Sequence, residues 1–311
     1  MKKLISVITH CYNEEANVEG LYEEVKKILG KNRDYDYEHI FIDNASEDKT
    51  VEILKKIAKK DKRLKIIVNL RNFGHIRSPF HGMLQCKGDA VISMASDFQD
   101  PPHLIPQLIE KWEQGYQVVL GVKTKSMENP AVFALRKIYY HLLKRMSNIQ
   151  VIENFSGYAL YDQKVIKTVR TIDDPYPYFR GLICDLGFHR ATVEYTQPKR
   201  KQGITKNNIY TLYDLAVLGI ISYSKIPLRL TIVAGLMLSL FSILTASGYL
   251  IYKLIYWDRF TLGLAPLVIG LFFFSSVQLL FLGVVGEYIG MIFTQVHKRP
   301  LVVEKERVNF G

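Results

Sequence analysis

Two long stretches without a charged residue constrain the fold of this 311-residue chain more than any other feature. Residues 230–252 and 261–286 contain no Asp, Glu, Lys or Arg. A helix rises about 1.5 Å per residue, so about 23 residues reach roughly 34 Å, which exceeds the bilayer core of about 30 Å. We therefore predict two transmembrane helices within residues 229–293. Two helices buried in a soluble core are the alternative.

The residues that flank these stretches predict an orientation. Aromatic side chains gather near their ends, as in interfacial belts: Tyr249, Tyr252, Tyr256, Trp257 and Tyr288. Lys or Arg residues precede the first stretch and follow the second: Lys225, Arg229, Lys298, Arg299, Lys305 and Arg307. The positive-inside rule then places both termini in the cytoplasm. We expect an integral protein of a bacterial inner membrane, with residues 294–311 as a cytoplasmic tail.

Small residues along the two stretches leave the oligomeric state open. Such residues let helices approach closely, either within one chain or between copies. They are Gly235, Ala246, Gly248, Gly283, Gly286 and Gly290. A homo-oligomer is therefore compatible with the sequence and is not required by it.

The first two thirds of the chain have the pattern of a soluble α/β domain, residues 1–208. Strand-like runs alternate with amphipathic helical runs, which predicts a mostly parallel sheet covered by helices on both faces. The expected strands are 4–10, 39–43, 64–69, 90–95 and 117–122, and the expected helices are 14–29, 48–59, 78–86 and 102–114. A basic helix over 131–146 and a looser region to 208 follow. Residues 209–228 are predicted to form an interfacial amphipathic helix, with a core helix as the alternative.

The net charge of +11 points to an anionic partner. Basic proteins bind nucleic acids, anionic membrane surfaces or phosphorylated substrates. The sequence has no zinc-finger spacing and no RNA-binding aromatic motif, so we expect no nucleic acid and favour a lipid bilayer. The three cysteines, Cys11, Cys86 and Cys184, are scattered, which argues against a disulfide framework.

Polar clusters follow three of the predicted strands. They are residues 12–15, 43–50 and 97–100. Ligands of parallel α/β sheets bind beyond the carboxyl ends of the strands, so these clusters predict one binding site. Asp97 and Gln99 offer oxygen ligands for Mg²⁺ or Mn²⁺, completed by substrate phosphates. Asp100, ahead of two prolines, is expected to cap the following helix.

These motifs and their order resemble those of a glycosyltransferase of family 2 with the GT-A fold. Within that family the chain is most similar to polyprenyl-phosphate glycosyltransferases and dolichol-phosphate mannose synthases. The matching segments occur in the family's order: VITHCYNEE (7–15), FIDNASEDKT (41–50), RNFG (71–74), SDFQDPP (96–102), RGL (180–182), KRKQGITK (199–206) and GEYIG (286–290). Together they cover nearly the whole chain, including both apolar stretches.

The resemblance implies roles for individual residues. Tyr12, Glu14 and Asp43 would contact the nucleoside, expected to be uridine, and Asp97 and Gln99 would hold the metal. Other positions would line the nucleotide-sugar site: His10, Asn13, Asn44, Ser46, Asp48, Gly74, Arg77, Ala95 and Ser96. For Arg77, an outward-facing surface position is the alternative. Arg200 and Lys206 would lie on a loop that closes over the phosphates and would take part in catalysis.

Three positions depart from the family pattern. The usual Asp-x-Asp motif has Ala95 at its first position, and the first strand, which normally ends in Pro, has His10 there. A third Asp of the family falls on Gly157. Glu153 lies close by in the sequence and is the expected catalytic substitute.

The resemblance implies an inverting, metal-dependent transfer of a hexose, expected to be glucose, from a UDP-sugar donor to a polyprenyl (undecaprenyl) phosphate acceptor. A lipid phosphate is already anionic near neutral pH, so this reaction needs no strong general base. Two alternatives remain: a transferase for a hydroxyl acceptor, which requires Glu153 or Asp162 as a base, and an inactive nucleotide-binding membrane scaffold.

Overall fold

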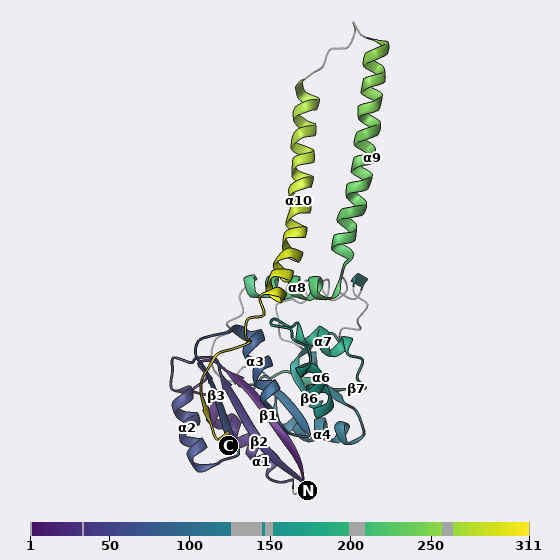
Figure 1. Ribbon diagram of the computed structural model, residues 1–311. Helices are drawn as coiled ribbons and strands as arrows, with labels where there is room; N and C mark the ends of the chain where they lie inside the picture. Colours follow the sequence, from purple (N-terminus) through teal and green to yellow (C-terminus); the bar gives the residue numbers. More distant parts are fainter. Residues whose placement is uncertain are drawn as a thin grey trace.

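The computed structural model describes residues 2–32, 34–125, 145–146, 152–198, 209–256 and 264–310. Figure 1 shows a layered α/β domain with a long helical hairpin projecting from one end. Apart from 145–146, the predicted basic helix over 131–146 lies outside the described residues. The loop that carries Arg200 and Lys206 also lies outside them.

The described part of the soluble domain is built on one eight-stranded sheet with the order β7-β5-β6-β4-β1-β2-β3-β8. Neighbouring strands in the segment β4-β1-β2-β3 are parallel, whereas β6 and β8, which flank this segment, pair antiparallel to β4 and β3. The strands are β1 (Lys3–Cys11), β2 (Tyr35–Asp43), β3 (Leu64–Asn69), β4 (Ala90–Ala95), β5 (Val118–Lys125), β6 (Phe155–Asp162), β7 (Arg190–Thr196) and β8 (Glu304–Val308).

The five strands expected from the sequence are confirmed, and three more complete the sheet. β1 and β2 are rich in β-branched and aromatic residues and are almost entirely buried, as central parallel strands are. The sequence-based expectation lacks β6, β7 and β8. It treated residues 147–208 as irregular and residues 294–311 only as a tail.

Helices cover both faces of the sheet, as predicted. One face packs against α1 (Val18–Leu29), α2 (Thr50–Lys60) and α4 (Ile105–Glu113), which a short 3₁₀ helix, η1 (Pro102–Leu104), precedes. The other face packs against α3 (Gly74–Gln85), α6 (Gln163–Arg170) and α7 (Phe179–Asp185). α3 lies very close to the sheet, because a Cβ atom on Gly82 would stand 2.8 Å from Ile8 Cδ1.

The two predicted apolar helices are present and extend beyond the predicted bounds. After α8 (Ile209–Tyr223), the helices α9 (Ile226–Ile255) and α10 (Leu264–Val296) form the hairpin in Figure 1. Ile226–Ile255 and Leu267–Val296 are candidate membrane spans, with hydropathies of 2.0 and 2.3. The most apolar stretch of each helix has no residue buried inside the protein, which contradicts the alternative of two core helices.

The base of the hairpin is fastened to the soluble domain by polar contacts. Tyr288 Oη of α10 donates a hydrogen bond to the Ser224 carbonyl, 2.7 Å away, between α8 and α9. Gln295 Nε2 donates to Asp174 Oδ1 over 2.8 Å, and Lys298 Nζ lies 3.0 Å from Asp173 Oδ2. Figure 1 shows α8 lying across this base. α10 is therefore tied both to the start of α9 and to the segment before α7.

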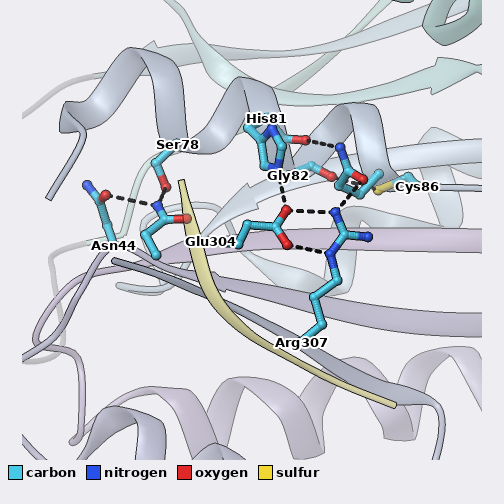
Figure 2. Close-up of polar contacts among 9 residues, drawn as sticks. Asn44, Ser78, His81, Gly82, Cys86, Glu304 and Arg307 are labelled. Carbon is cyan, nitrogen blue, oxygen red and sulfur yellow. Dashed lines mark hydrogen bonds and ion pairs between the residues drawn. The ribbon is translucent and has the colours of Figure 1, made fainter. Parts of the chain in front are cut away.

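After α10 the chain returns to the sheet as β8, at the outer edge of β3. The Leu70 amide donates to the Val303 carbonyl over 2.9 Å. Figure 2 shows the side chains that reinforce this return. Glu304 Oε1 lies 2.5 Å from His81 Nε2 of α3 and accepts from Arg307 Nη2 over 2.7 Å. Arg307 Nη2 also donates to Gln85 Oε1 over 2.9 Å.

The carboxylate of Glu304 makes the docking of β8 dependent on pH. Burial raises the pKa of Glu304, but hydrogen bonds from Arg307 and His81 outweigh that effect and leave the pKa below its ordinary value of 4.5. A carboxylate whose pKa is lowered by folding stabilises the native state above its unfolded pKa. That stabilisation is lost as the pH falls through the folded value.

We therefore expect Glu304→Gln to loosen β8 at pH 7 by about 1.5 kcal/mol, since hydrogen bonds to charged groups contribute on that scale. Amide hydrogen exchange of residues 304–308 should quicken about tenfold, and the difference from the unsubstituted protein should shrink below pH 4. Glu306→Gln is the matched control, because Glu306 is exposed and forms a surface ion pair with Lys55. Equal effects of the two substitutions would contradict this role of Glu304.

Candidate active site

The polar clusters of the sequence meet at one edge of the sheet. In the β1–β2 ladder Cys11 is opposite Asp43, and in the β1–β4 ladder His10 is opposite Ala95. The loops after these strands are therefore neighbours, as predicted from the sequence. The same edge faces the hairpin, because Leu70 and Arg77 contact Val303 and Pro300, which follow α10. The N-terminus lies at the far end of the domain (Figure 1).

Direct hydrogen bonds join the loops after β1 and β2. The Asn13 amide donates to Ser46 Oγ over 2.8 Å, and Asn13 Oδ1 accepts from the Glu47 amide over 2.8 Å. Asp43 is fully buried, and its Oδ2 accepts from the Ser46 amide over 2.9 Å. Burial raises the pKa of Asp43. Asp43 therefore holds the second loop in place, and its contact with a nucleoside remains a prediction.

A second set of contacts connects the β1 loop to the start of α2. The Glu14 amide donates to Thr50 Oγ1 over 2.9 Å, and the Glu15 amide donates to Asp48 Oδ2 over 3.1 Å. Glu14 is buried, and its Oε2 accepts from Asn17 Nδ2 over 2.6 Å. Tyr12, between His10 and these residues, is partly exposed at the same edge. The two loops thus form one rigid wall.

Asn44 extends this wall to α3. Its Oδ1 accepts from Asn69 Nδ2 over 3.1 Å and from the Phe73 amide over 2.9 Å. Its Nδ2 donates to Asn72 Oδ1 over 2.8 Å. Asn69 Nδ2 also donates to Ser78 Oγ of α3 over 2.9 Å. The start of α3 at Gly74, where φ is +85°, is therefore fixed to the end of β2.

The third loop, after β4, is held by two buried carboxylates. Asp97 is 8% exposed, and its Oδ1 accepts from the Gln99 amide over 3.1 Å. Asp100 Oδ2 accepts from the Ala95 amide over 2.9 Å, and Asp100 Oδ1 accepts from Tyr195 Oη over 3.2 Å. Burial raises the pKa of Asp100. The expectation that Asp100 caps the following helix is wrong, since its carboxylate folds back onto the strand and binds β7.

The backbone is strained at this edge. Four non-glycine residues with positive φ lie in the loops around it: Asn13 (54°), Ala45 (64°), Phe98 (62°) and Asn154 (61°). Such conformations cost energy for residues with a Cβ, and they concentrate at sites of function. The dense hydrogen bonding described above is what keeps the loops in this geometry.

The side chain of His10, near the end of β1, has a buried ring nitrogen without a hydrogen-bond partner among the described residues. This nitrogen is Nδ1, whereas the residue as a whole is partly exposed. Burial lowers the pKa of the imidazole, and the nearby Asp97 carboxylate opposes that shift. Ala95 and Ser96 lie beside it at the end of β4, and Ser96 is buried.

The oxygen ligands at this edge could bind a hard divalent cation if substrate phosphates supplied further ligands. Among the described residues there is no group of three or more His, Cys, Asp and Glu that could hold a metal ion alone. Asp97 and Gln99 lie on one buried loop at the strand end. They would leave most of the coordination sphere to phosphate oxygens and water, as Mg²⁺ sites commonly do.

Arg77 lies at the border between the site and the hairpin. Its Nη2 donates to the Pro300 carbonyl, and its guanidinium lies 5.5 Å from the Phe73 ring centroid. Burial lowers the pKa of Arg77. Arg77 therefore joins α3 to the segment after α10, and a contact with the diphosphate remains a prediction.

Glu153, the residue expected to replace the family's base, lies in the turn before β6, and Gly157, where the family's Asp falls, lies on β6. β6 is antiparallel to β4, so its start lies at the same edge as Asp97. Glu153 is exposed in that turn. Gly157 has φ of +109°, a conformation that L side chains rarely adopt. The structure thus places Glu153 at the correct edge, while its catalytic role stays a prediction.

Two tyrosines that support the site were missed by the sequence analysis. Tyr195 of β7 holds Asp100, and Tyr158 Oη of β6 donates to the Pro101 carbonyl over 3.0 Å. The alternation of Ala191, Val193 and Tyr195 with polar residues is a strand signal that could have revealed β7. Nothing in the local sequence indicates which loop these tyrosines contact.

Comparisons with known proteins agree with this architecture. The sequence model described as "Glycosyl transferase family 2" matches residues 6–170. An uncharacterized glycosyltransferase of Bacillus subtilis is 33% identical over 305 residues, covering 96% of this chain and 92% of the relative. A prophage-derived bactoprenol glucosyl transferase of Shigella flexneri is 31% identical over 303 residues, covering 97% of both chains.

Among solved structures, glucosyl-3-phosphoglycerate synthase from Mycobacterium tuberculosis, in complex with Mn²⁺, UDP and phosphoglyceric acid, has the same fold. The TM-score is 0.51 at 20% sequence identity, covering 70% of this chain and 76% of the other. The match of the family model, the identity to relatives along nearly the whole chain and the shared fold lead to one conclusion. This chain belongs to glycosyl transferase family 2.

Proposed function

We propose that this enzyme transfers glucose from UDP-glucose to a polyprenyl phosphate, such as undecaprenyl phosphate, at the cytoplasmic face of a membrane. The observation that carries the proposal is the position of the polar loops, at the sheet edge that faces the apolar hairpin. A soluble donor and a lipid acceptor could meet there. The similarity to a bactoprenol glucosyl transferase supports glucose and a polyprenyl acceptor.

The donor would bind against the wall formed by the loops after β1 and β2. Tyr12, Glu14 and Asp43 lie around one strand edge and are proposed to surround the uridine. Asn13, Asn44, Ser46 and Asp48 would keep the loops in position through the hydrogen bonds described above. Because these bonds join protein groups to one another, little ordering would be needed when the donor binds.

Asp97 and Gln99 are proposed to hold Mg²⁺ or Mn²⁺ beside the donor diphosphate. The ion would supply neutralisation of the negative charge that grows on the leaving UDP. Asp100 and Tyr195 act as positioning residues, because they fix the loop that carries Asp97. Arg200 and Lys206, outside the described residues, are proposed to contribute further positive charge at the phosphates.

The chemistry needs charge compensation more than proton transfer. An oxygen of the lipid phosphate attacks the anomeric carbon, the bond from that carbon to the UDP oxygen breaks, and UDP leaves with the electron pair. The configuration at carbon is inverted. Two unit charges about 4 Å apart repel by about 4 kcal/mol at an effective dielectric near 20. Left uncompensated, that repulsion would slow transfer nearly a thousandfold.

The orientation in the membrane follows from the same attachments. Before α9, Asp214 of α8 accepts a hydrogen bond from Tyr176 of the soluble domain, and after α10, β8 pairs with β3, so both ends of the hairpin would lie on one side of the bilayer. We propose that this side is the cytoplasm, since the flanking residues are basic. UDP-sugars are made there, which fits the proposed donor.

The proposed function predicts lipid-linked product in a defined assay. Purified protein in detergent, UDP-glucose, Mn²⁺ and undecaprenyl phosphate should yield glucosylated lipid, detected by mass spectrometry of the extracted lipids. A panel of UDP-sugars in parallel reactions tests the sugar, and undecaprenol in place of its phosphate tests the acceptor. No product with any donor and the lipid phosphate would overturn the proposal.

Asp97→Asn should abolish most of the transfer. The change keeps the shape of the side chain and removes its charge, so turnover should fall at least about 100-fold, the scale on which lost electrostatic stabilisation acts. The melting temperature should stay unchanged. Asp89→Asn is the matched control, because exposed Asp89 precedes β4 at the opposite edge, where it binds the Leu4 amide. Full turnover by the Asp97 variant would refute the metal assignment.

Glu153→Ala separates the phosphate acceptor from the hydroxyl acceptor. With a lipid phosphate no base is required, so kcat should change by less than about threefold. Asp162 caps α6 at the opposite end of β6 from the site, so a hydroxyl acceptor would need Glu153 as its base, and the loss would then reach about 100-fold or more. Steady-state rates at saturating UDP-glucose distinguish the two outcomes.

A further inference from the structure

Two departures from the family pattern are neighbours in the structure. His10 and Ala95 are Cα partners in the parallel β1–β4 ladder. Side chains alternate along a strand, so residues directly opposite each other lie on the same face. Ile8 and Val91 belong to one hydrophobic cluster, and His10 and Ala95 follow them at even spacing on that face. The chain therefore places an imidazole beside the position where the Asp-x-Asp carboxylate is missing.

The imidazole of His10 differs from that of the core residue His39 in its exposure to the site. His39 is fully buried, its ring packs 4.3 Å from that of Phe41, and its Nε2 lies 2.9 Å from Thr9 Oγ1, while its Nδ1 has no hydrogen-bond partner among the described residues. His10 is partly exposed at the site, and its Nδ1 is buried with no hydrogen-bond partner in the residues that the structure describes. Buried ring nitrogens without a partner are rare and call for a ligand or an ordered water.

The small side chain of Ala95 leaves the place beside His10 free of a competing carboxylate. Asp97 follows two residues later, and its charge acts on His10. His10 at the end of β1 and the loop with Asp97 and Gln99 after β4 therefore lie at neighbouring strand ends. Carboxylates, carbonyl oxygens and imidazoles each bind first-row divalent metals.

We propose that His10 is a third protein ligand of the divalent cation, together with Asp97 and Gln99. This inference rests on the proposed function, in which that cation binds the donor diphosphate. A nitrogen ligand favours Mn²⁺ over Mg²⁺, because Mg²⁺ prefers oxygen and follows strict octahedral geometry. The site would also carry one negative charge fewer than a site with two carboxylates. That difference eases the approach of an anionic acceptor.

Pulsed electron paramagnetic resonance of bound Mn²⁺ tests the proposal without any turnover. The full chain in detergent, loaded with Mn²⁺ and UDP, should show a ¹⁴N coupling from a directly bound imidazole. His10→Ala should remove this coupling and weaken Mn²⁺ binding, measured by titration calorimetry in the presence of UDP, by about tenfold or more. His189→Ala is the matched control, because His189 is exposed and stacks on Tyr116, away from the site.

A double variant restores the oxygen ligand. His10→Ala combined with Ala95→Asp should regain Mn²⁺ affinity without the ¹⁴N coupling, and its preference for Mn²⁺ over Mg²⁺ should drop. Recovery of binding in this variant also shows that the loss in His10→Ala is not a folding defect. Thermal melting of each variant gives an independent check on the fold.

The outcomes separate this inference from the proposed function. If the unsubstituted protein binds no Mn²⁺ with UDP, the metal dependence in the proposed function is overturned and this inference with it. If Mn²⁺ binds and the coupling is absent, or persists in His10→Ala, only the assignment of His10 is overturned. Loss of the coupling in His75→Ala instead would move the ligand to the start of α3 and equally overturn it.

Discussion

The pairing of β8 with β3 is the interaction on which the placement of the site depends. The chain leaves the sheet, passes through α8, α9 and α10, and comes back to the sheet edge next to α3. Side-chain contacts of Glu304 with His81 and Arg307 stabilise this pairing. As a result, the segment after α10 lies against Leu70 and Arg77, at the carboxyl ends of the parallel strands. The hairpin cannot swing to another edge while β8 is paired.

The second constraint is the rigidity of the loops at that edge. Strained backbone at Asn13 and Ala45 is held by hydrogen bonds between their two loops, and strained backbone at Phe98 by a hydrogen bond within its own loop. An active site for two anionic substrates needs its charges fixed in advance, because flexible groups would reorient and lose much of their effect. The buried carboxylates of Asp43 and Asp100 serve this end by holding backbone amides.

The sequence predicted the parallel half of the fold well, for a physical reason. The strands from β1 to β5 are runs of β-branched and apolar residues between amphipathic helices, and this local pattern is visible without any partner. Polar residues at strand ends then located the site, because parallel topology brings those ends together. Both apolar helices were equally evident from length and charge alone.

The parts that could not be predicted depend on long-range contacts. β8 has the sequence EKERV, mostly charged, and forms a strand only because β3 offers an unpaired edge 235 or more positions earlier in the chain. The two prolines after Asp100 predict a helix cap, but its carboxylate instead accepts hydrogen bonds from Tyr195 Oη and the Ala95 amide. The neighbourhood of His10 and Ala95 likewise requires the register of β1 against β4.

The late position of β8 has a consequence for biogenesis. Residues 304–308 are synthesised after both apolar helices. Until then β3 keeps an exposed edge, and such edges recruit other strands. Membrane insertion and completion of the sheet are thereby coupled in time. If insertion of the hairpin stalled, β3 would remain an unpaired edge strand. Such an edge exposes the soluble domain to aggregation and proteolysis.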